Sequence, residues 1–247
     1  MITAEISGHI GRITLNRPEA HNALTKAAMA ELEGVLHGWA AHDIRAVILT
    51  GAGRSFCAGA SLDELGDGDW DNNPLTTLCD TVEDFKAPVI AALNGGVFGG
   101  GVELALACDF RIGVQGMKMF VPPAKLGIHY ESGGIARAVQ RLGAQMARRA
   151  FLLAEKFEGE ALLSAGFLDD LVAPEALPER AEAMATEIAA LAPLAVQGMK
   201  RTILEISRGT LDAPAAQARV RTCFASSDHA EGLAAMREKR PPAFTGS

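Results

Sequence analysis

The segment from Pro88 to Asp109 constrains the fold of this chain more than any other part of its sequence. It begins with an apolar run, 89–93, which predicts a buried strand. The next residues predict a helix with Glu103 in its first turn. Free N–H groups and the positive dipole end at a helix start favour negative charge, so the segment predicts a site for an anion or for developing negative charge. Between strand and helix lie five glycines, which permit a tight turn and close backbone approach: Gly95, Gly96, Gly99, Gly100 and Gly101.

A second segment repeats this arrangement. Residues 46–51 predict another buried strand, and the small residues of 51–60 predict a turn that leads into an acidic helix start. Two such turns allow two backbone donors to converge on one ligand atom. The alternation of apolar runs and amphipathic windows from residue 2 to residue 109 implies strand–helix crossovers. These patterns predict the α/β fold class.

The remainder of the chain is predicted from its hydrophobic spacing. The acidic, glycine-rich stretch 66–74 predicts a loop that is too short to separate two domains. Strands are predicted at 10–15, 109–114, 118–121 and 166–172. Helices are predicted at 25–40, 134–142, 145–153, 159–164, 175–191, 193–207 and 215–240. Periodicity therefore predicts an α/β body with a helical tail.

Composition narrows the class of protein. With 49% hydrophobic and 21% charged residues among 247, the chain has ample material for a core. No apolar run approaches the roughly 18 to 20 residues of a membrane span, and the first residues lack the blocks of a secretory signal, so we expect a soluble, cytoplasmic protein. A formal net charge of −7 argues against nucleic-acid binding that relies on a basic face.

The cysteines and the basic clusters are not predicted to take part in catalysis or ligand binding. The cysteines are far apart and form no Cys-x-x-Cys pair, so we predict buried small side chains, with neither a disulfide framework nor a metal site. They are Cys57, Cys79, Cys108 and Cys223. Two basic clusters fall on predicted helices, and for both we favour a solvated face over a contact with phosphates or a partner. The clusters are Arg137, Arg141, Arg148 and Arg149, and Lys200 with Arg201.

Four segments resemble those of one enzyme family. Residues 16–24 (Asn-Arg-Pro-Glu-Ala-His-Asn-Ala-Leu), 56–60 (Phe-Cys-Ala-Gly-Ala) and 99–103 (Gly-Gly-Gly-Val-Glu) are similar to the signature segments of the enoyl-CoA hydratase/isomerase, or crotonase, superfamily. Residues 231–244 resemble that family's usual C-terminus. Together they occur in the family's order over nearly the whole chain. A dinucleotide-binding interpretation fails, because residues 96–101 lack the Gly-x-Gly-x-x-Gly order.

The resemblance implies a fold and an assembly. In this family, repeated ββα units wind into a crotonase-like spiral, and a C-terminal helical extension forms trimer contacts. The implied division is a spiral core with the coenzyme A and active sites over residues 1–190 and a helical trimerisation region over 191–247. The implied partners are an acyl-CoA substrate and further copies of the chain, as a homotrimer or a dimer of trimers. Coenzyme A enters as part of the thioester substrate and is not a permanently bound cofactor.

The resemblance also implies an oxyanion hole. Crotonase-type enzymes stabilise the enolate of a CoA thioester between two backbone N–H groups, which by motif position belong here to Ala60 and Gly100. Removing one such donor in comparable sites costs about 2.7 to 4 kcal/mol of transition-state stabilisation. The residues implied for the adenine and pantetheine channel are Arg17, Ala20, Leu24, Ala58 and Leu62.

The acid/base residues depart from the family pattern. Glu103 matches one of the two glutamates of hydratases, but Pro123 occupies the place of the second. Hydratases divide water activation and carbon protonation between two carboxylates, so this loss argues against efficient water addition. Further candidates follow: Tyr130 is similar to the tyrosine of methylmalonyl-CoA decarboxylases, and His129 is a candidate general acid or anion partner. Glu131 would restore a second carboxylate from a shifted position.

Three functional hypotheses remain open. The first is an acyl-CoA enzyme of hydratase or isomerase type in which Glu103 transfers the proton, and a double-bond isomerase requires a single base. The second is decarboxylation of a short malonyl-type thioester, with Tyr130 and His129 around the substrate carboxylate. The third is a non-catalytic acyl-CoA-binding homologue, which the retained Glu103 and glycines disfavour. The first two differ in whether removing Glu103 abolishes turnover.

Overall fold

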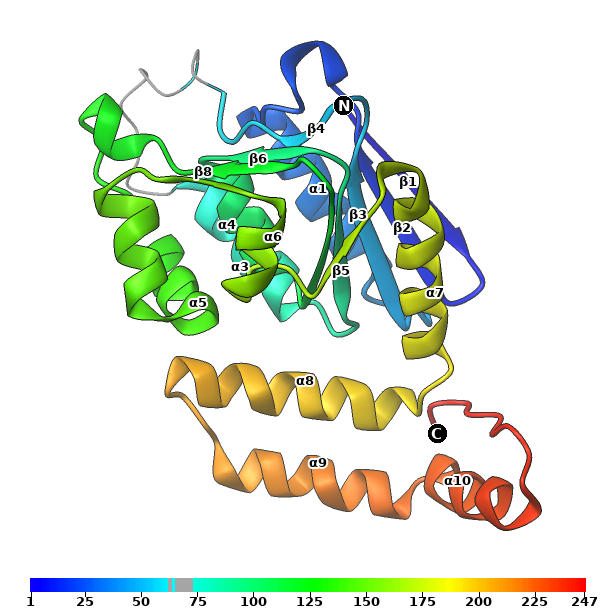
Figure 1. Cartoon of the computed structure of the whole chain (residues 1–247). Coiled ribbons are helices and arrows are strands. Elements are labelled where there is room, and N and C mark those ends of the chain that lie inside the picture. The colour runs from blue at the N-terminus through cyan, green and yellow to red at the C-terminus, as the bar shows by residue number, and fades with distance from the viewer. Residues whose placement is uncertain (62–63, 65–72) are drawn as a thin grey trace.

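A computed structural model describes residues 1–61, 64 and 73–247 of the chain. The channel candidate Leu62 and most of the predicted loop 66–74 lie outside these residues. Figure 1 shows a body of strands and helices with a layer of C-terminal helices beneath it. The α/β class predicted from the sequence is confirmed.

The larger sheet forms the centre of the body. Within the described part of the chain it has six strands, in the order β1-β2-β3-β5-β7-β10. β1 is antiparallel to β2, and the other neighbours are parallel. β3 and β5 are buried along almost their whole length, which explains why their sequences are continuous apolar runs. The strand bounds, in that order, are Ile2–Ser7, Ile10–Leu15, Ala46–Gly51, Val89–Leu93, Phe110–Val114 and Asp170–Val172.

A second, smaller sheet consists of short strands in the order β4-β6-β8-β9. Their bounds, in that order, are Ser55–Cys57, Gly96–Phe98, Lys118–Phe120 and Lys156–Glu158. β9 is antiparallel to β8, whereas β4, β6 and β8 are parallel. The sequence predicted only β8 among them. All four strands have three residues, which is too short for an alternating pattern to be reliable.

The chain passes back and forth between the two sheets. β3 is followed by β4 and α3 (Pro74–Asp84), β5 by β6 and α4 (Gly100–Ala107), and β7 by β8 and α5 (Ser132–Leu152). In each unit the first strand joins the larger sheet and the second joins the smaller one. These are repeated ββα units, so the spiral fold is confirmed. Because β4, β6 and β8 are parallel, the turns that leave them meet at one edge of the smaller sheet.

Most predicted helices are present with small shifts at their ends. α1 begins after Thr25, whose Oγ1 accepts a hydrogen bond from the N–H of Ala28 at 3.1 Å. The matching helices are α1 (Lys26–Trp39), α6 (Gly159–Ser164), α7 (Leu177–Ala189) and α8 (Pro193–Arg208). Short 3₁₀ helices occupy Pro18–Ala20, Pro123–Leu126 and Pro174–Ala176.

Three predicted boundaries need correction. The windows 134–142 and 145–153 both belong to α5, which Gly143 interrupts with a φ of 78°. The helix predicted at 215–240 is two helices, α9 (Ala213–Ala225) and α10 (Ser227–Glu238), because Ser226 is extended and its side chain caps α10. The strand predicted at 166–172 begins only at Asp170. The sequence analysis did not predict α3.

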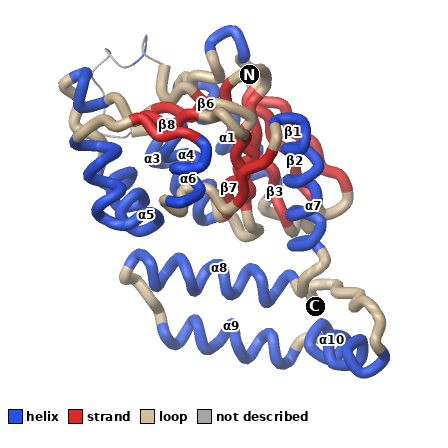
Figure 2. Tube along the Cα trace, viewed as in Figure 1, coloured by secondary structure: helices blue, strands red, loops and turns tan. Residues whose placement is uncertain are grey.

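The C-terminal layer is formed by α8, α9 and α10. Figure 2 shows helices and loops in this layer, whereas the strands lie in the body. α8 and α9 pack against each other. α8 joins the body through Lys200, whose Nζ donates to Asp109 Oδ2 at 2.7 Å and to the carbonyl oxygen of Ala87 at 3.0 Å. Leu204 on the same side of α8 is also buried.

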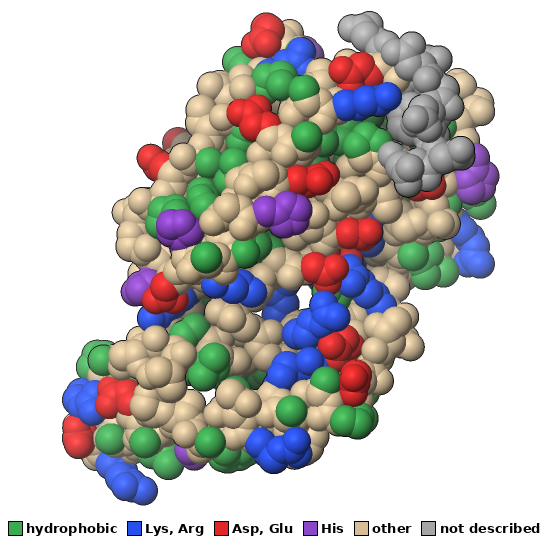
Figure 3. Space-filling model, turned by 180° about the vertical axis from the view of Figure 1, so that it is seen from behind, with side chains coloured by type: hydrophobic (Ala, Val, Ile, Leu, Met, Phe, Trp, Pro, Cys, Tyr) green, Lys and Arg blue, Asp and Glu red, His purple; other side chains and the backbone are tan. Residues whose placement is uncertain are grey.

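The solvated-face interpretation of the basic clusters is wrong for Arg137 and Lys200, whose side chains are 5 and 10% exposed and paired with acids, whereas Arg148, Arg149 and Arg201 are exposed as predicted. Arg137 is buried among acidic side chains, and Arg141 contacts one of the same acids. Lys200 pairs with Asp109, and Arg201 pairs with acids on α3 and α8. Viewed from behind, acidic and basic side chains lie together where the C-terminal helices meet the body (Figure 3).

The cysteines are free thiols. Cys57, Cys79 and Cys108 are buried as predicted, whereas Cys223 on α9 is only partly buried. In the ranges that the structure covers, no helix combines the length and the apolar character that crossing a membrane requires.

Candidate active site

A cavity of about 430 Å³ lies at the edge where the turns after β4 and β6 meet the segment before α5. It unites the residues that the sequence analysis selected for chemistry. Its lining contains Ala60, Gly100, Glu103, His129, Tyr130 and Glu131, together with Ala58 and Pro123. These residues come from three of the ββα units, which explains why they are far apart in sequence and close in space.

The predicted oxyanion-hole donors lie in adjoining turns. Gly99 adopts a φ of 51° at the end of β6, which turns the chain into α4 and makes Gly100 the first helical residue. The N–H of a first helical residue has no intrahelical partner. A Cβ built on Gly100 would lie 3.4 Å from the backbone nitrogen of Ala60, so the two turns are in contact.

The neighbours of Ala60 fix its orientation. The N–H of Leu24 donates to the carbonyl oxygen of Gly59 at 2.8 Å, and the N–H of Ser61 donates to the carbonyl oxygen of Leu24 at 2.8 Å. Because successive residues of an extended chain face opposite sides, the N–H of Ala60 faces away from Leu24. Within the described residues, neither this N–H nor that of Gly100 donates a backbone hydrogen bond. Both are free to bind a ligand oxygen.

Glu103 supplies a carboxyl group from the first turn of α4. The residue is only 2% exposed, yet it lines the cavity. Its Oε1 accepts a hydrogen bond from Arg137 Nη1 at 2.8 Å, whereas its buried Oε2 has no hydrogen-bond partner among the described residues. Burial raises the pKa of Glu103, and the charge of Arg137 opposes that rise in part. A buried carboxyl with a raised pKa and a free oxygen is equipped for proton transfer.

Tyr130 lies beside Glu103. Its hydroxyl donates to the carbonyl oxygen of Gly99 at 3.3 Å, and its ring contacts Phe151 edge-on with centroids 5.0 Å apart. Burial and the neighbouring Glu103 carboxylate raise the pKa of Tyr130 well above its usual range. The phenol therefore stays protonated near neutral pH and acts as a hydrogen-bond donor rather than as a base.

His129 and Glu131 contribute polar groups to the same cavity. His129 is exposed, and its Nδ1 lies 2.7 Å from the carbonyl oxygen of Tyr130. Glu131 is half-buried at the residue that precedes α5. Pro123 begins a 3₁₀ helix and belongs to the lining, at the sequence position where the resemblance would place a second carboxylate. Glu131 is thus the second carboxyl group among the described lining residues.

Comparison with known proteins identifies the family. The family model described as enoyl-CoA hydratase/isomerase matches residues 5–247. The chain belongs to the enoyl-CoA hydratase/isomerase family. This is a family of enzymes that act on CoA thioesters, and the crotonase-type resemblance of the four sequence segments is thereby confirmed.

Several members of the enoyl-CoA hydratase/isomerase family are similar along their whole length. A 2,3-dehydroadipyl-CoA hydratase of Escherichia coli (strain K12) is 33% identical over 240 residues, which cover 95% of this chain and 94% of that protein. An (E)-benzylidenesuccinyl-CoA hydratase of Thauera aromatica is 32% identical over 268 residues, covering 100% and 99%. The solved structure of an enoyl-CoA hydratase/carnithine racemase from Magnetospirillum magneticum is 30% identical, has a TM-score of 0.93, and is matched over 100% of this chain and 96% of that one.

The residues implied for the coenzyme A channel of this family member have unequal access. Ala58 lines the cavity, and Ala20 is half-buried in the 3₁₀ helix nearby. Arg17 donates from Nη1 to the carbonyl oxygen of Ala23 at 3.1 Å. Leu24 is 1% exposed and belongs to the core. Leu62 lies outside the described residues.

Sequence reasoning missed Asn22, which shapes the loop that contains Arg17, Ala20 and Leu24. Asn22 is buried with a φ of 57°. Its Oδ1 accepts from the N–H of Arg17 at 2.9 Å, and its Nδ2 donates to the carbonyl oxygens of Ala52 and Ser55 at 2.9 and 2.8 Å. It therefore joins the loop 17–24 to the turn between β3 and β4. The motif 16–24 contains Asn22, but nothing in its spacing shows those distant partners.

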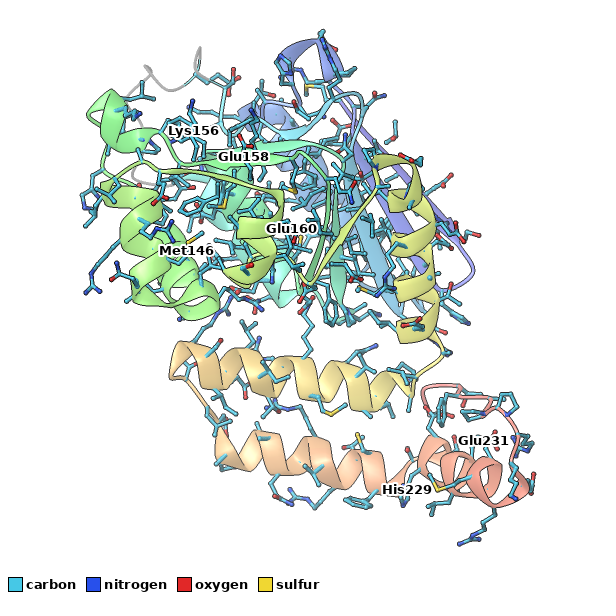
Figure 4. The ribbon with its side chains drawn as sticks, viewed as in Figure 1. Met146, Lys156, Glu158, Glu160, His229 and Glu231 are labelled. Atoms are coloured by element: carbon cyan, nitrogen blue, oxygen red, sulfur yellow. The ribbon has the colours of Figure 1, made fainter. Side chains whose placement is uncertain are left out.

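Two titratable groups of α10 lie at the end of the C-terminal layer. Figure 4 shows His229 and Glu231 on α10, at the opposite end of the molecule from Lys156 and Met146. Glu231 pairs with Arg240 at 2.6 Å. Neither His229 nor Glu231 belongs to the lining of the cavity.

Proposed function

We propose that this chain is an acyl-CoA enzyme of hydratase or isomerase type that works through a thioester enolate. The observation that carries the proposal is the meeting of two free backbone donors, Ala60 and Gly100, with the buried carboxyl of Glu103 in one cavity. Each part has a distinct task in stabilising an enolate and moving a proton.

In the proposed mechanism, the thioester carbonyl oxygen lies between the N–H groups of Ala60 and Gly100. These donors stabilise the negative charge as the enolate forms, and each is worth about 2.7 to 4 kcal/mol. Glu103 removes or returns the proton through Oε2, the oxygen without a partner. Burial raises the pKa of Glu103 toward neutral pH, and a general base is most effective when its pKa lies near the operating pH. Tyr130 remains a neutral donor beside it.

A single carboxyl is sufficient for double-bond migration. Glu103 takes a proton from one carbon of the acyl chain and returns it to another. Hydration needs a further group that activates water, and Glu131 is the carboxyl available for that step in the described lining. The wall formed by Leu75, Leu126 and Ile128 favours an uncharged acyl chain.

The cavity disfavours the decarboxylase alternative. Decarboxylation of a malonyl-type thioester requires binding of a substrate carboxylate. The described lining carries the carboxyl groups of Glu103 and Glu131 and includes neither lysine nor arginine, so His129 is the remaining candidate cation. Two carboxylates repel a third at short range. A purely binding homologue is also disfavoured, because a buried carboxyl oxygen without a partner costs stability and serves no binding purpose.

Parallel assays in deuterium oxide test these alternatives. The purified protein is incubated with crotonyl-CoA, a 3-enoyl-CoA and methylmalonyl-CoA, and products and deuterium content are followed by mass spectrometry. We expect water addition or double-bond migration with deuterium incorporation, reduced about 100-fold or more in Glu103→Gln. Loss of CO₂ that survives in the variant would favour the decarboxylase. Tight acyl-CoA binding with neither turnover nor exchange would refute the catalytic proposal.

We also propose that the protein is cytoplasmic, because its free thiols favour a reducing compartment.

Residues 191–247 are proposed to form a homotrimer interface. One side of α8 faces the body and another packs against α9, whereas Met199, Ile203 and Ile206 are 59, 65 and 60% exposed. Exposed apolar side chains in a group favour an interface. Sedimentation velocity should give a trimer or a dimer of trimers, and Ile203→Asp should shift it toward monomer. A monomeric wild-type protein would contradict this proposal.

A further inference from the structure

Arg137 connects the carboxyl of Glu103 to two other acids in the interior. Arg137 lies on α5 and is 4% exposed. Its Nη1 donates to Glu103 Oε1 at 2.8 Å, and its Nε donates to Glu83 Oε2 at 3.2 Å. Its Nη2 donates to Asp80 Oδ1. The proposed function gives this arginine no role.

The contact with Arg137 makes the two oxygens of Glu103 unequal. Oε1 is committed to the guanidinium, whereas Oε2 is free and belongs to a cavity-lining side chain. A guanidinium is planar and donates in fixed directions, so its contact restricts the orientation of the carboxylate more than a flexible ammonium would. The direction of the free oxygen therefore depends on the position of Arg137.

Arg137 is itself fixed by acids from α3. Glu83 is 4% exposed and also accepts from Arg208 Nη2 at 2.7 Å and from Arg141 Nη2 at 3.4 Å. Asp80 lies one helical turn before Glu83 on the same helix. Because three nitrogens of Arg137 have acidic partners, its guanidinium cannot rotate without breaking another ion pair. The resulting series of alternating charges runs from α4 through α5 and α3 to α8.

The charges that face Glu103 come from several elements. Tyr130 approaches from the segment before α5, Cys79 and Asp80 belong to α3, and Arg137 belongs to α5. Of these groups, Arg137 is the cation. Burial and Asp80 raise the pKa of Glu103, whereas Arg137 and the Tyr130 hydroxyl lower it. Loss of Arg137 therefore favours the protonated, inactive form of a general base.

We propose that Arg137 is a positioning residue, which holds Oε1 of Glu103 so that Oε2 faces the substrate as a carboxylate. This inference rests on the proposed function, in which Glu103 transfers the proton. Arg137 acts through Glu103 and does not line the cavity itself.

The chain offers a matched control on the same helix. Arg141 lies four residues after Arg137 and contacts Glu83, but it forms no ion pair with Glu103. We expect Arg137→Gln to lower kcat about tenfold or more, to change KM less than about threefold, and to move the acid limb of the pH–rate profile upward by about one unit. Arg137→Lys should restore part of this loss, and Arg141→Gln should leave the profile unchanged.

A second variant serves as a control for loss of folding in Arg137→Gln. Removing one partner of a buried ion pair destabilises a protein strongly, so Arg137→Gln is also made together with Glu83→Gln, which removes the matching negative charge. The double variant keeps the cavity and Glu103 while it removes the contact under test. If it folds and its pH–rate profile equals that of wild type, the inference is overturned.

A readout that needs no turnover separates this inference from the proposed function. Infrared difference spectra between wild type and Glu103→Gln isolate the carboxyl band of Glu103, whose pH titration is then followed in each Arg137 variant. An upward shift of the midpoint in Arg137→Gln, but not in Arg141→Gln, supports positioning even if all the acyl-CoA assays fail. Equal midpoints in wild type and Arg137→Gln, or an equal shift in Arg141→Gln, overturn it.

Discussion

Replacing Gly134 by alanine would place one methyl group directly against the proposed proton-transfer carboxyl. Gly134 is buried in the first turn of α5. A Cβ built there would lie 2.6 Å from Oε2 and 2.8 Å from Cδ of Glu103, and 2.4 Å from Cε1 of Tyr130. Ordinary contact begins at 3.4 Å, so the carboxylate must retreat by about 0.8 Å and the ring by about 1 Å.

Stability and activity should respond very differently to Gly134→Ala. Alanine favours a helix over glycine by about 0.5 to 1 kcal/mol. The forced shift of packed side chains costs about 1 to 3 kcal/mol. We therefore expect a net loss of about 2 kcal/mol or less, which leaves the protein folded. A displacement of about 1 Å in a catalytic site, by contrast, costs on the order of 100-fold in rate.

Gly133→Ala is the control for this prediction. A Cβ on Gly133 would lie 3.4 Å from Thr76 Cγ2 and 3.9 Å from Arg137 Nη1, which are ordinary contacts. Turnover of the substrate found for the wild type and thermal melting are measured for both variants. We expect near-normal kcat in Gly133→Ala and about 1% of it in Gly134→Ala. If Glu103→Gln is inactive while Gly134→Ala keeps kcat within about twofold of wild type, the reasoning is refuted.

Three further predictions concern stability and ligand binding. Burial raises the folded-state pKa of Glu103 above its unfolded value, so the folded protein loses stability as pH rises through that pKa, by about 1.4 kcal/mol for each unit by which the pKa is raised. Glu103→Gln lacks this titration, so its melting temperature should rise relative to that of wild type from pH 5 to pH 8. A difference in melting temperature that stays constant with pH would contradict this. Asn22→Ala removes the donor to the carbonyl oxygen of Ala52 and the acceptor for the N–H of Arg17, so urea unfolding should show a loss of about 2 to 4 kcal/mol and kinetics a raised acyl-CoA KM; an unchanged KM would separate this loop from the channel. Ser226→Ala removes the cap of α10 and should cost about 1 kcal/mol, visible as faster hydrogen exchange in α10 and not in β3.

Local sequence patterns were sufficient to predict two buried strands and the glycine turn that leads into α4. β3 and β5 are continuous apolar runs because they are buried along almost their whole length. The glycines after β5 predicted the turn into α4, and the structure has Gly99 at a positive φ there. Both signals depend on neighbouring residues, so they are visible in one short stretch of sequence.

Apart from β8, the strands of the smaller sheet were not predicted, and neither was α3. β4, β6 and β9 have three residues each, and they become strands because they pair with one another and with β8. The break between α9 and α10 was also missed, since the apolar spacing of 215–240 continues through Ser226. Pairing partners and capping geometry decide such boundaries more than periodicity does.

The sequence by itself determined which groups are available for chemistry: two small-residue turns, one glutamate in a helix start, and a polar segment after Pro123. Only the tertiary structure decided their arrangement. Arg137 appeared in sequence as one of several exposed basic residues, yet it is buried against Glu83 and Glu103, which lie 54 and 34 positions away. Such pairing follows from how α3, α4 and α5 pack, and the cost of burying an unpaired charge makes the long-range partners of Arg137 necessary.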